Sequence, residues 1–171
     1  MPTHPHVLRI TILFPPLTKF PDNTLLSEIS TSEISTPITN AESLTLPYLQ
    51  AVIFEGLRFY PPFTGWPFKV VPPEGDSIDG KFIPGGTRLS PNFPALMRLK
   101  HIFGEDVEVF RPERWLDGDK DKVAEMRRVT EMVFGYGRWG CAGRHLAFLE
   151  LGKVFVEVST VKKKGRRGDY G

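Results

Sequence analysis

The sequence predicts a mainly α-helical fold with small β elements, in the α+β class. Two stretches, residues 45–60 and 142–159, carry apolar side chains at helical spacing. Between them, residues 67–90 contain short β-type runs separated by Pro-Gly turns. The chain also has 16 glycines and 16 prolines among its 171 residues, an excess that favours a turn-rich chain over a compact helical bundle.

Composition excludes several classes of protein. Hydrophobic residues make up 40% of the chain and charged residues 25%, so it is not a disordered polymer. The single cysteine excludes a disulfide framework and a zinc site built from several cysteines. Residues 7–14 are too few to cross a membrane and lack a signal-peptide cleavage site, so we expect a reducing compartment. The length allows one small domain or a piece of a larger protein.

The two ends of the chain differ from its middle. Residues 1–43 contain a tandem Ser-Glu-Ile-Ser-Thr repeat at 27–36, and we expect a low-complexity or poorly ordered leader with at most a short helical turn. Residues 159–171 form a basic tail with five Lys or Arg and one Asp. Such a tail can contact nucleic acid or anionic lipid. We interpret it as a solvated end and expect no nucleic-acid partner.

The first predicted helix begins at Thr45, a suitable N-cap, with Pro47 in its first turn. It ends before Pro61, which cannot continue a helix. Its charged residues, Glu55 and Arg58, are three apart and are therefore neighbours on one side of the helix. Because the helix is apolar nearly all round, we expect it to be buried together with this charged pair.

Short elements follow the first helix. Residues 70–71 and 81–83 are predicted strands, each followed by a turn that contains Pro and Gly. Residues 103–115 form a loop with alternating acidic side chains, and a short, exposed helix is predicted at 122–128.

Cys141 lies in an unusual loop, residues 134–143, which contains four glycines. Glycines let the backbone approach a flat or bulky group, and the start of the helix at 142–159 stabilises a thiolate. Such a thiolate can be a nucleophile, a redox thiol or a soft metal ligand. His145, four residues on, allows a Cys–His thiol pair. A haem site accounts for more of the loop, because it uses the ligand, the glycines and the cation of Arg138.

These motifs resemble the C-terminal part of cytochrome P450 proteins, and in particular of the fungal members of that family. Residues 134–143 match the haem-binding signature Phe–Gly–x–Gly–x–Arg–x–Cys–x–Gly. Residues 55–58 resemble the Glu–x–x–Arg helix, and residues 110–115 resemble the Pro–Glu–Arg–Phe segment. The three motifs occur in the family's order, and the resemblance covers residues 44–158.

The resemblance implies an incomplete, C-terminal part of the P450 fold, with Cys141 as the axial ligand of the iron of haem b. It implies a structural triad of Glu55, Arg58 and Arg114. The other positions that it assigns to cofactor binding are Phe134, Gly135, Gly137, Arg138, Trp139, Ala142 and Gly143.

One position departs from the family pattern. The residue two before the cysteine is usually Arg or His and contacts a haem propionate, whereas this chain has Trp139. Arg138 beside it and the indole N–H of Trp139 are candidates for that contact. Lys69 is a further candidate cation.

The family's activity is that of a haem-thiolate monooxygenase, which oxidises a small organic substrate with O2 and electrons from NADPH. The resemblance implies a cytochrome P450 reductase-like electron donor, which would approach the Cys141 loop near Arg127, Arg128 and Arg144. Eukaryotic relatives are usually held at the endoplasmic reticulum membrane by an N-terminal helix. This chain shows no such anchor, so we expect a cytoplasmic location when it is expressed alone.

An alternative is a truncated, catalytically inactive fragment that does not hold haem stably. No Ala/Gly-Gly-x-Asp/Glu-Thr stretch precedes Glu55, so we expect the oxygen-activating half and most substrate contacts to be absent. Within this chain, Phe63, Thr64 and Gly65 are the candidate substrate contacts. A minor alternative is a thiol enzyme that uses Cys141 with His145.

Overall fold

The computed structural model describes residues 23–62 and 68–166, with side chains up to residue 161. The candidate substrate contacts Phe63, Thr64 and Gly65 lie outside the described residues, as does the apolar stretch at 7–14. The helices are α3 (Asn23–Thr31), α4 (Asn40–Leu44), α5 (Pro47–Phe59), α6 (Phe93–Leu96), α7 (Lys100–Phe103), α8 (Lys120–Glu131) and α9 (Arg144–Arg166). Short 3-10 turns are η1 (Pro112–Trp115), η2 (Met132–Phe134) and η3 (Gly137–Trp139).

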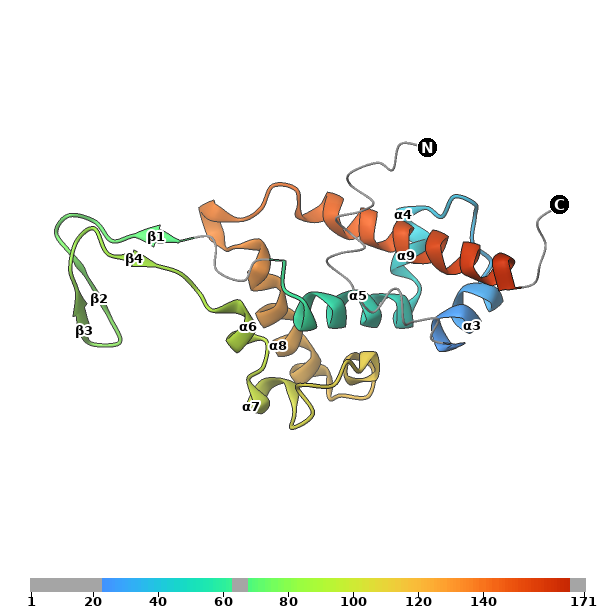
Figure 1. Cartoon of the computed structure of the whole chain (residues 1–171), viewed down its shortest axis with the longest axis horizontal. Coiled ribbons are helices and arrows are strands. Elements are labelled where there is room, and N and C mark those ends of the chain that lie inside the picture. The colour runs from blue at the N-terminus through green and yellow to red at the C-terminus, as the bar shows by residue number, and fades with distance from the viewer. Residues whose placement is uncertain (1–22, 63–67, 167–171) are drawn as a thin grey trace.

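Helix α5 is the centre of the fold, with packed elements on opposite sides (Figure 1). One apolar cluster joins it to α3 and α9 through residues such as Leu25, Leu49 and Phe155. Another joins it to α6, α7, η1 and α8 through residues such as Phe54 and Trp115. The predicted burial of this helix is therefore correct, and the mainly α class with small β elements is confirmed.

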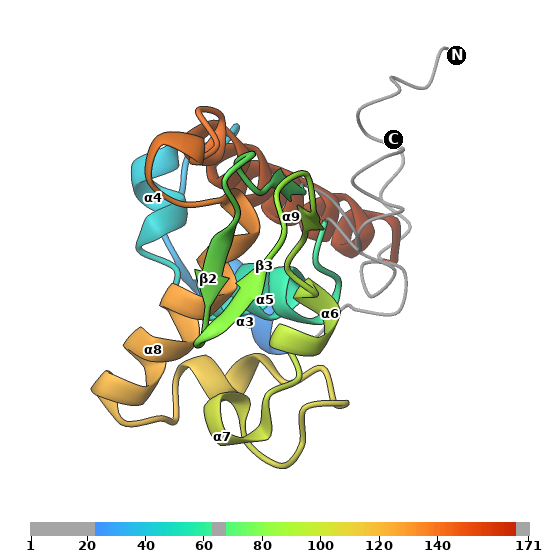
Figure 2. The same cartoon turned by 90° about the vertical axis from the view of Figure 1, so that its left-hand side faces the viewer.

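The strands project from the helical body as a narrow arm, at the left of Figure 1 and towards the viewer in Figure 2. β1 (Lys69–Val70) pairs antiparallel with β4 (Arg88–Leu89), and β2 (Asp76–Ile78) pairs with β3 (Lys81–Ile83). Asp79 and Gly80 join β2 to β3 with φ angles of 52° and 73°. Positive φ at both turn positions suits the right-handed twist of a hairpin, which explains an Asp-Gly pair here.

Residues 23–43 add two helices to the packed structure. Leu25 of α3 and Ile38 before α4 are 6% and 1% exposed, and both belong to the cluster around α5. Their burial explains why a Ser/Thr-rich stretch is helical here, since its few apolar side chains find a shared core. The division at residue 43 between a leader and the family region stays a prediction. At the other end, α9 continues to Arg166, into the segment predicted as a basic tail.

The predicted N-cap of the central helix is wrong. Thr45 instead ends α4, where its hydroxyl donates to the carbonyl of Glu42 at 2.8 Å. The cap of α5 comes from α3, because the carboxylate of Glu28 accepts the N–H groups of Tyr48 at 2.8 Å and Leu49 at 2.9 Å. A carboxylate at this end also suits the positive end of the helix dipole. A tertiary contact has replaced the local cap.

Candidate functional site

The loop that carries Cys141 runs from the end of η2 to the start of α9. Its two ends are joined by a hydrogen bond, in which the N–H of Cys141 donates to the carbonyl of Phe134 at 2.7 Å. Gly135 turns the chain with φ of 77°, and a Cβ atom there would lie 2.5 Å from the carbonyl oxygen of Trp139. Only glycine fits that position without a shift of the loop.

Cys141 itself is exposed and lies three residues before α9 begins at Arg144. Its carbonyl accepts the N–H of Arg144 at 3.3 Å, and the carbonyl of Gly143 accepts the N–H of Ala147 at 2.9 Å. The thiol therefore lies close to the N-terminal end of a long helix. Ala142 and Gly143 are small and exposed, so neither covers the sulfur. An exposed cysteine flanked by small residues fits an axial ligand of a haem iron.

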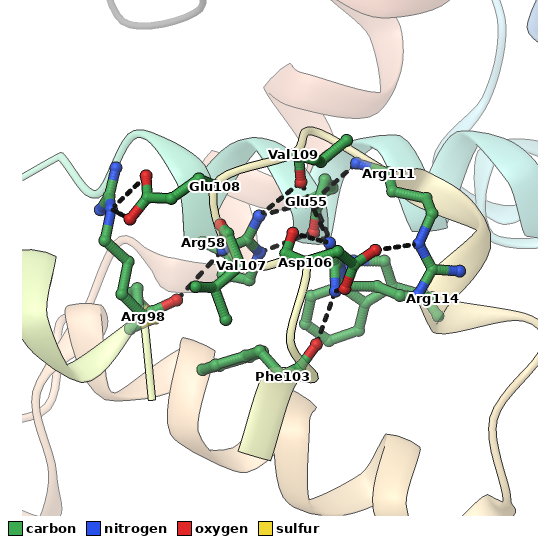
Figure 3. Close-up of polar contacts among 12 residues, drawn as sticks. Glu55, Arg58, Arg98, Phe103, Asp106, Val107, Glu108, Val109, Arg111 and Arg114 are labelled. Atoms are coloured by element: carbon green, nitrogen blue, oxygen red, sulfur yellow. Dashed lines mark hydrogen bonds and ion pairs between the residues drawn. The ribbon is translucent and has the colours of Figure 1, made fainter. Parts of the chain in front are cut away.

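A second cluster lies on α5 and the loop after α7 (Figure 3). Glu55 and Arg58 are both 0% exposed, and the guanidinium of Arg58 forms a bidentate pair with the Glu55 carboxylate at 2.7 and 2.8 Å. The Nε of Arg114 reaches the same carboxylate at 3.1 Å. The structure thus brings Glu55, Arg58 and Arg114 together, although they come from elements far apart in the sequence.

The two arginines also organise the backbone of residues 97–109. Arg58 donates to the carbonyls of Met97 at 3.1 Å and Val107 at 2.8 Å. Arg114 donates to the carbonyls of Phe103 at 2.6 Å and Val109 at 3.0 Å. A loop with little regular structure has its buried carbonyls satisfied in this way, and two guanidiniums replace a ladder of backbone hydrogen bonds.

Sequence reasoning missed two members of this cluster. The indole N–H of Trp115 donates to Glu55 Oε2 at 3.0 Å. Asp106 pairs with Arg114 at 2.9 Å and with Arg111 at 2.5 Å. The hydrogen bond from Arg111, aided by Arg114, lowers the pKa of the Asp106 carboxyl to about 2. In the sequence, the available signal was an acid a few residues before the Pro–Glu–Arg segment.

Comparison with known proteins decides the family. The sequence model of the cytochrome P450 family matches residues 24–158. The chain belongs to the cytochrome P450 family. Its members carry haem, in agreement with the expectation from the Cys141 loop.

Relatives of this P450 chain include fungal monooxygenases. It is 52% identical over 121 residues to cytochrome P450 monooxygenase ABA1 of Pyricularia oryzae, covering 71% of this chain and 24% of that protein. It is 48% identical over 124 residues to cytochrome P450 monooxygenase abl1 of Leptosphaeria maculans, covering 72% and 22%. It is 44% identical over 130 residues to cytochrome P450 monooxygenase aba1 of Botryotinia fuckeliana, covering 76% of this chain and 26% of that protein. The chain thus spans about a quarter of the length of the curated relatives it matches.

The departure from the P450 pattern at Trp139 has a structural counterpart. The ammonium of Lys69 lies 3.7 Å from the centroid of the Trp139 ring, and the guanidinium of Arg138 lies 4.9 Å from it. The ring is 60% exposed. β1 therefore brings Lys69 to the Cys141 loop, so the structure places all three of these candidate residues together.

The predicted arginine patch for an electron donor is less uniform than expected. Arg144 pairs with Glu131 at 2.7 Å, and the guanidinium of Arg127 lies 4.6 Å from the centroid of the buried Phe54 ring. Arg128 is exposed and lines a cavity of about 410 Å³. The other residues that line this cavity are Val129, Glu131, Met132, Gly135, Tyr136 and Arg144.

The alternative thiol pair has less support. His145 is exposed, one helical turn beyond Cys141, and among the described residues no hydrogen bond joins the two side chains.

The described part of the chain also contains no helix long and apolar enough to cross a membrane.

Proposed function

We propose that this chain supplies the haem-thiolate part of a fungal-type P450 monooxygenase, with Cys141 as the axial ligand. The observation that carries the proposal is the closed loop at residues 134–143, which ends in an exposed thiol at the start of α9. The match to fungal monooxygenases supports the same activity, namely oxidation of a small organic substrate.

Each part of the loop has a task in this proposal. Cys141, close to the N-terminal end of α9, would hold the haem iron as its axial ligand. The carbonyl of Phe134 accepts the N–H of Cys141 and so closes the loop, and Gly135 allows the close approach of the backbone at Trp139, while Gly137 adopts a positive φ. Ala142 and Gly143 leave the sulfur open, and Arg138 and Trp139 are exposed on the same loop. Bound haem would supply the iron that activates O2, with thiolate donation favouring cleavage of the O–O bond.

Glu55, Arg58 and Arg114 act at a distance in this proposal. They are buried and contact neither the thiol nor an open surface, so their role is to hold the loop of residues 97–109 on α5. Removing one partner would leave an uncompensated buried charge, which is strongly destabilising.

Electrons would come from NADPH through a reductase-like partner. Arg128, beside the exposed ring of Tyr136, is the best placed cation for an acidic partner, because Arg127 and Arg144 already have contacts inside the chain. An electrostatic contact of this kind sets association rate more than affinity. Arg128→Gln should therefore slow reduction at low salt and have little effect at high salt.

The proposal is tested by an experiment that identifies the axial ligand of the haem iron. The full chain is supplied with haem, reduced and exposed to carbon monoxide, and its Soret band is recorded. Thiolate ligation predicts a strongly red-shifted band in the wild-type chain and in His145→Ala, but not in Cys141→Ala. The same red-shifted band in Cys141→Ala, or no haem uptake by the wild-type chain, would contradict the proposal.

A further inference from the structure

A cavity of about 410 Å³ is lined by three segments of the chain: the last turn of α8 with η2, the Cys141 loop, and Arg144 at the start of α9. Sites that bind small molecules have volumes of about 300–1,000 Å³, so this cavity is large enough for one. Gly135 turns the chain between η2 and the loop with φ of 77°, and Met132 and Tyr136 line the cavity before and after that turn. The fold thus brings both sides of the turn to one site.

Three of the side chains that line this cavity are largely apolar. Val129 is buried, whereas Met132 is half exposed and Tyr136 is 88% exposed. In the part of the chain that the structure describes, the Tyr136 ring packs against no other aromatic ring. A free ring face beside a thioether suits a flat aromatic ligand, because aromatic rings pack well on other rings and on methionine sulfur.

The charged residues of the cavity leave one positive charge without a partner. Glu131 is the one carboxylate among the lining residues, and its Oε1 pairs with Nη2 of Arg144 at 2.7 Å. Arg128 is exposed, and no carboxylate of a described residue lies within ion-pair distance of it. Two guanidiniums and one carboxylate give a net charge of +1. A guanidinium can donate two parallel hydrogen bonds to a carboxylate, so the cavity suits a ligand with one such group.

We propose that this cavity binds a small aromatic carboxylate, with the carboxylate on Arg128 and the ring beside Tyr136 and Met132. A neutral ligand of the same shape would leave the guanidinium without a partner, and a second negative charge would be repelled by Glu131. Such binding goes beyond the function proposed for Cys141 and needs no haem. Arg128 is also the cation proposed for the electron donor, so an occupied cavity should slow reduction, and only this consequence rests on the proposed function.

The experiment compares two ligands that differ in charge alone. The full chain, without added haem, is titrated with 2-naphthoate and with 2-naphthamide in a calorimeter. We expect the wild-type chain to bind 2-naphthoate about tenfold more tightly, because only the carboxylate accepts charge-assisted hydrogen bonds from Arg128. Arg128→Gln should bind both ligands with equal affinity. Lys122→Gln, which removes an exposed cation from the same helix, should keep the preference.

Substitutions at Tyr136 test the aromatic part of the proposal. Tyr136→Ala should weaken the binding of both ligands about fivefold, whereas Tyr136→Phe should leave both affinities unchanged. A preference for 2-naphthoate that survives in Arg128→Gln, equal affinities in the wild-type chain, or no binding of either ligand would overturn the inference. The Soret band of the reduced, carbon monoxide-bound haem should be the same in Arg128→Gln and in the wild-type chain, so this inference and the function proposed for Cys141 can fail separately.

Discussion

Replacing Trp115 with Phe should destabilise the chain although both side chains are aromatic. The ring of Trp115 is 3% exposed and lies 5.3 Å from Phe54 and 6.3 Å from Phe103, between ring centroids. Its indole N–H donates to Glu55 Oε2, which otherwise receives only the Nε of Arg58 among the described residues. Phe keeps one ring in the core but removes this donor. The substitution thus tests the hydrogen bond more than the packing.

The magnitude follows from the burial of Glu55. A hydrogen bond to a buried charged group contributes about 1.5–3 kcal/mol. The smaller ring adds about 1 kcal/mol of lost packing, so Trp115→Phe should lower the free energy of unfolding by about 3 kcal/mol. That is a large share of the roughly 5–15 kcal/mol typical of a domain.

Urea denaturation followed by circular dichroism measures this loss. The matched control is Trp139→Phe, because Trp139 is 60% exposed and donates no hydrogen bond to another described residue. It should change the free energy of unfolding by less than about 0.5 kcal/mol. A Trp115→Phe chain within 0.5 kcal/mol of the wild type would refute the reasoning, since the donor to Glu55 would then contribute nothing measurable.

Three further predictions concern the cap, the loop and the acid. Glu28→Gln should cost about 1 kcal/mol in urea denaturation, because it weakens the cap of α5, whereas Glu33→Gln, the same position in the second repeat, should be neutral. Gly135→Ala should lower haem uptake more than Gly137→Ala: both have positive φ, but only the first Cβ meets the loop backbone. The folded pKa of Asp106, about 2, is below its usual 3.8, so its stabilisation is complete above about pH 5 and is lost as the pH falls towards 2. Asp106→Asn should make the free energy of unfolding depend less on pH over that range. The same pH dependence as in the wild type would contradict the role given to the Asp106 carboxylate.

The sequence predicted those features that depend on local spacing. Glu55 and Arg58 are three residues apart on a helix apolar nearly all round, and such a pair is buried wherever that helix is buried. The Cys141 loop was equally visible, because its glycines and its cysteine are contiguous. In both cases the residues that carry the prediction lie within ten positions of one another in the sequence.

The features that the sequence did not predict depend on distant partners. Thr45 is a sound local cap, but Glu28 caps α5 from a helix twenty positions earlier. Trp115 and Asp106 join the Glu55 cluster only because the chain after α7, up to the end of η1, folds back onto α5. Local composition cannot show such contacts, since propensity is a weak prior that tertiary packing overrides.

A row of aromatic rings connects the Glu55 cluster to the Cys141 loop. Trp115 lies against Phe54, Phe54 lies 5.6 Å from Phe148 of α9, and Phe148 lies 5.4 Å from Phe134, between centroids. The backbone carbonyl of Phe134 in turn accepts the N–H of Cys141. Because protein interiors are close-packed, a shift of one ring displaces the next. We therefore expect the buried charges of α5 to affect the Cys141 loop through packing, so Trp115→Phe should weaken haem uptake as well as stability. If haem affinity instead stayed at the wild-type value while stability fell, the loop would be positioned independently of α5.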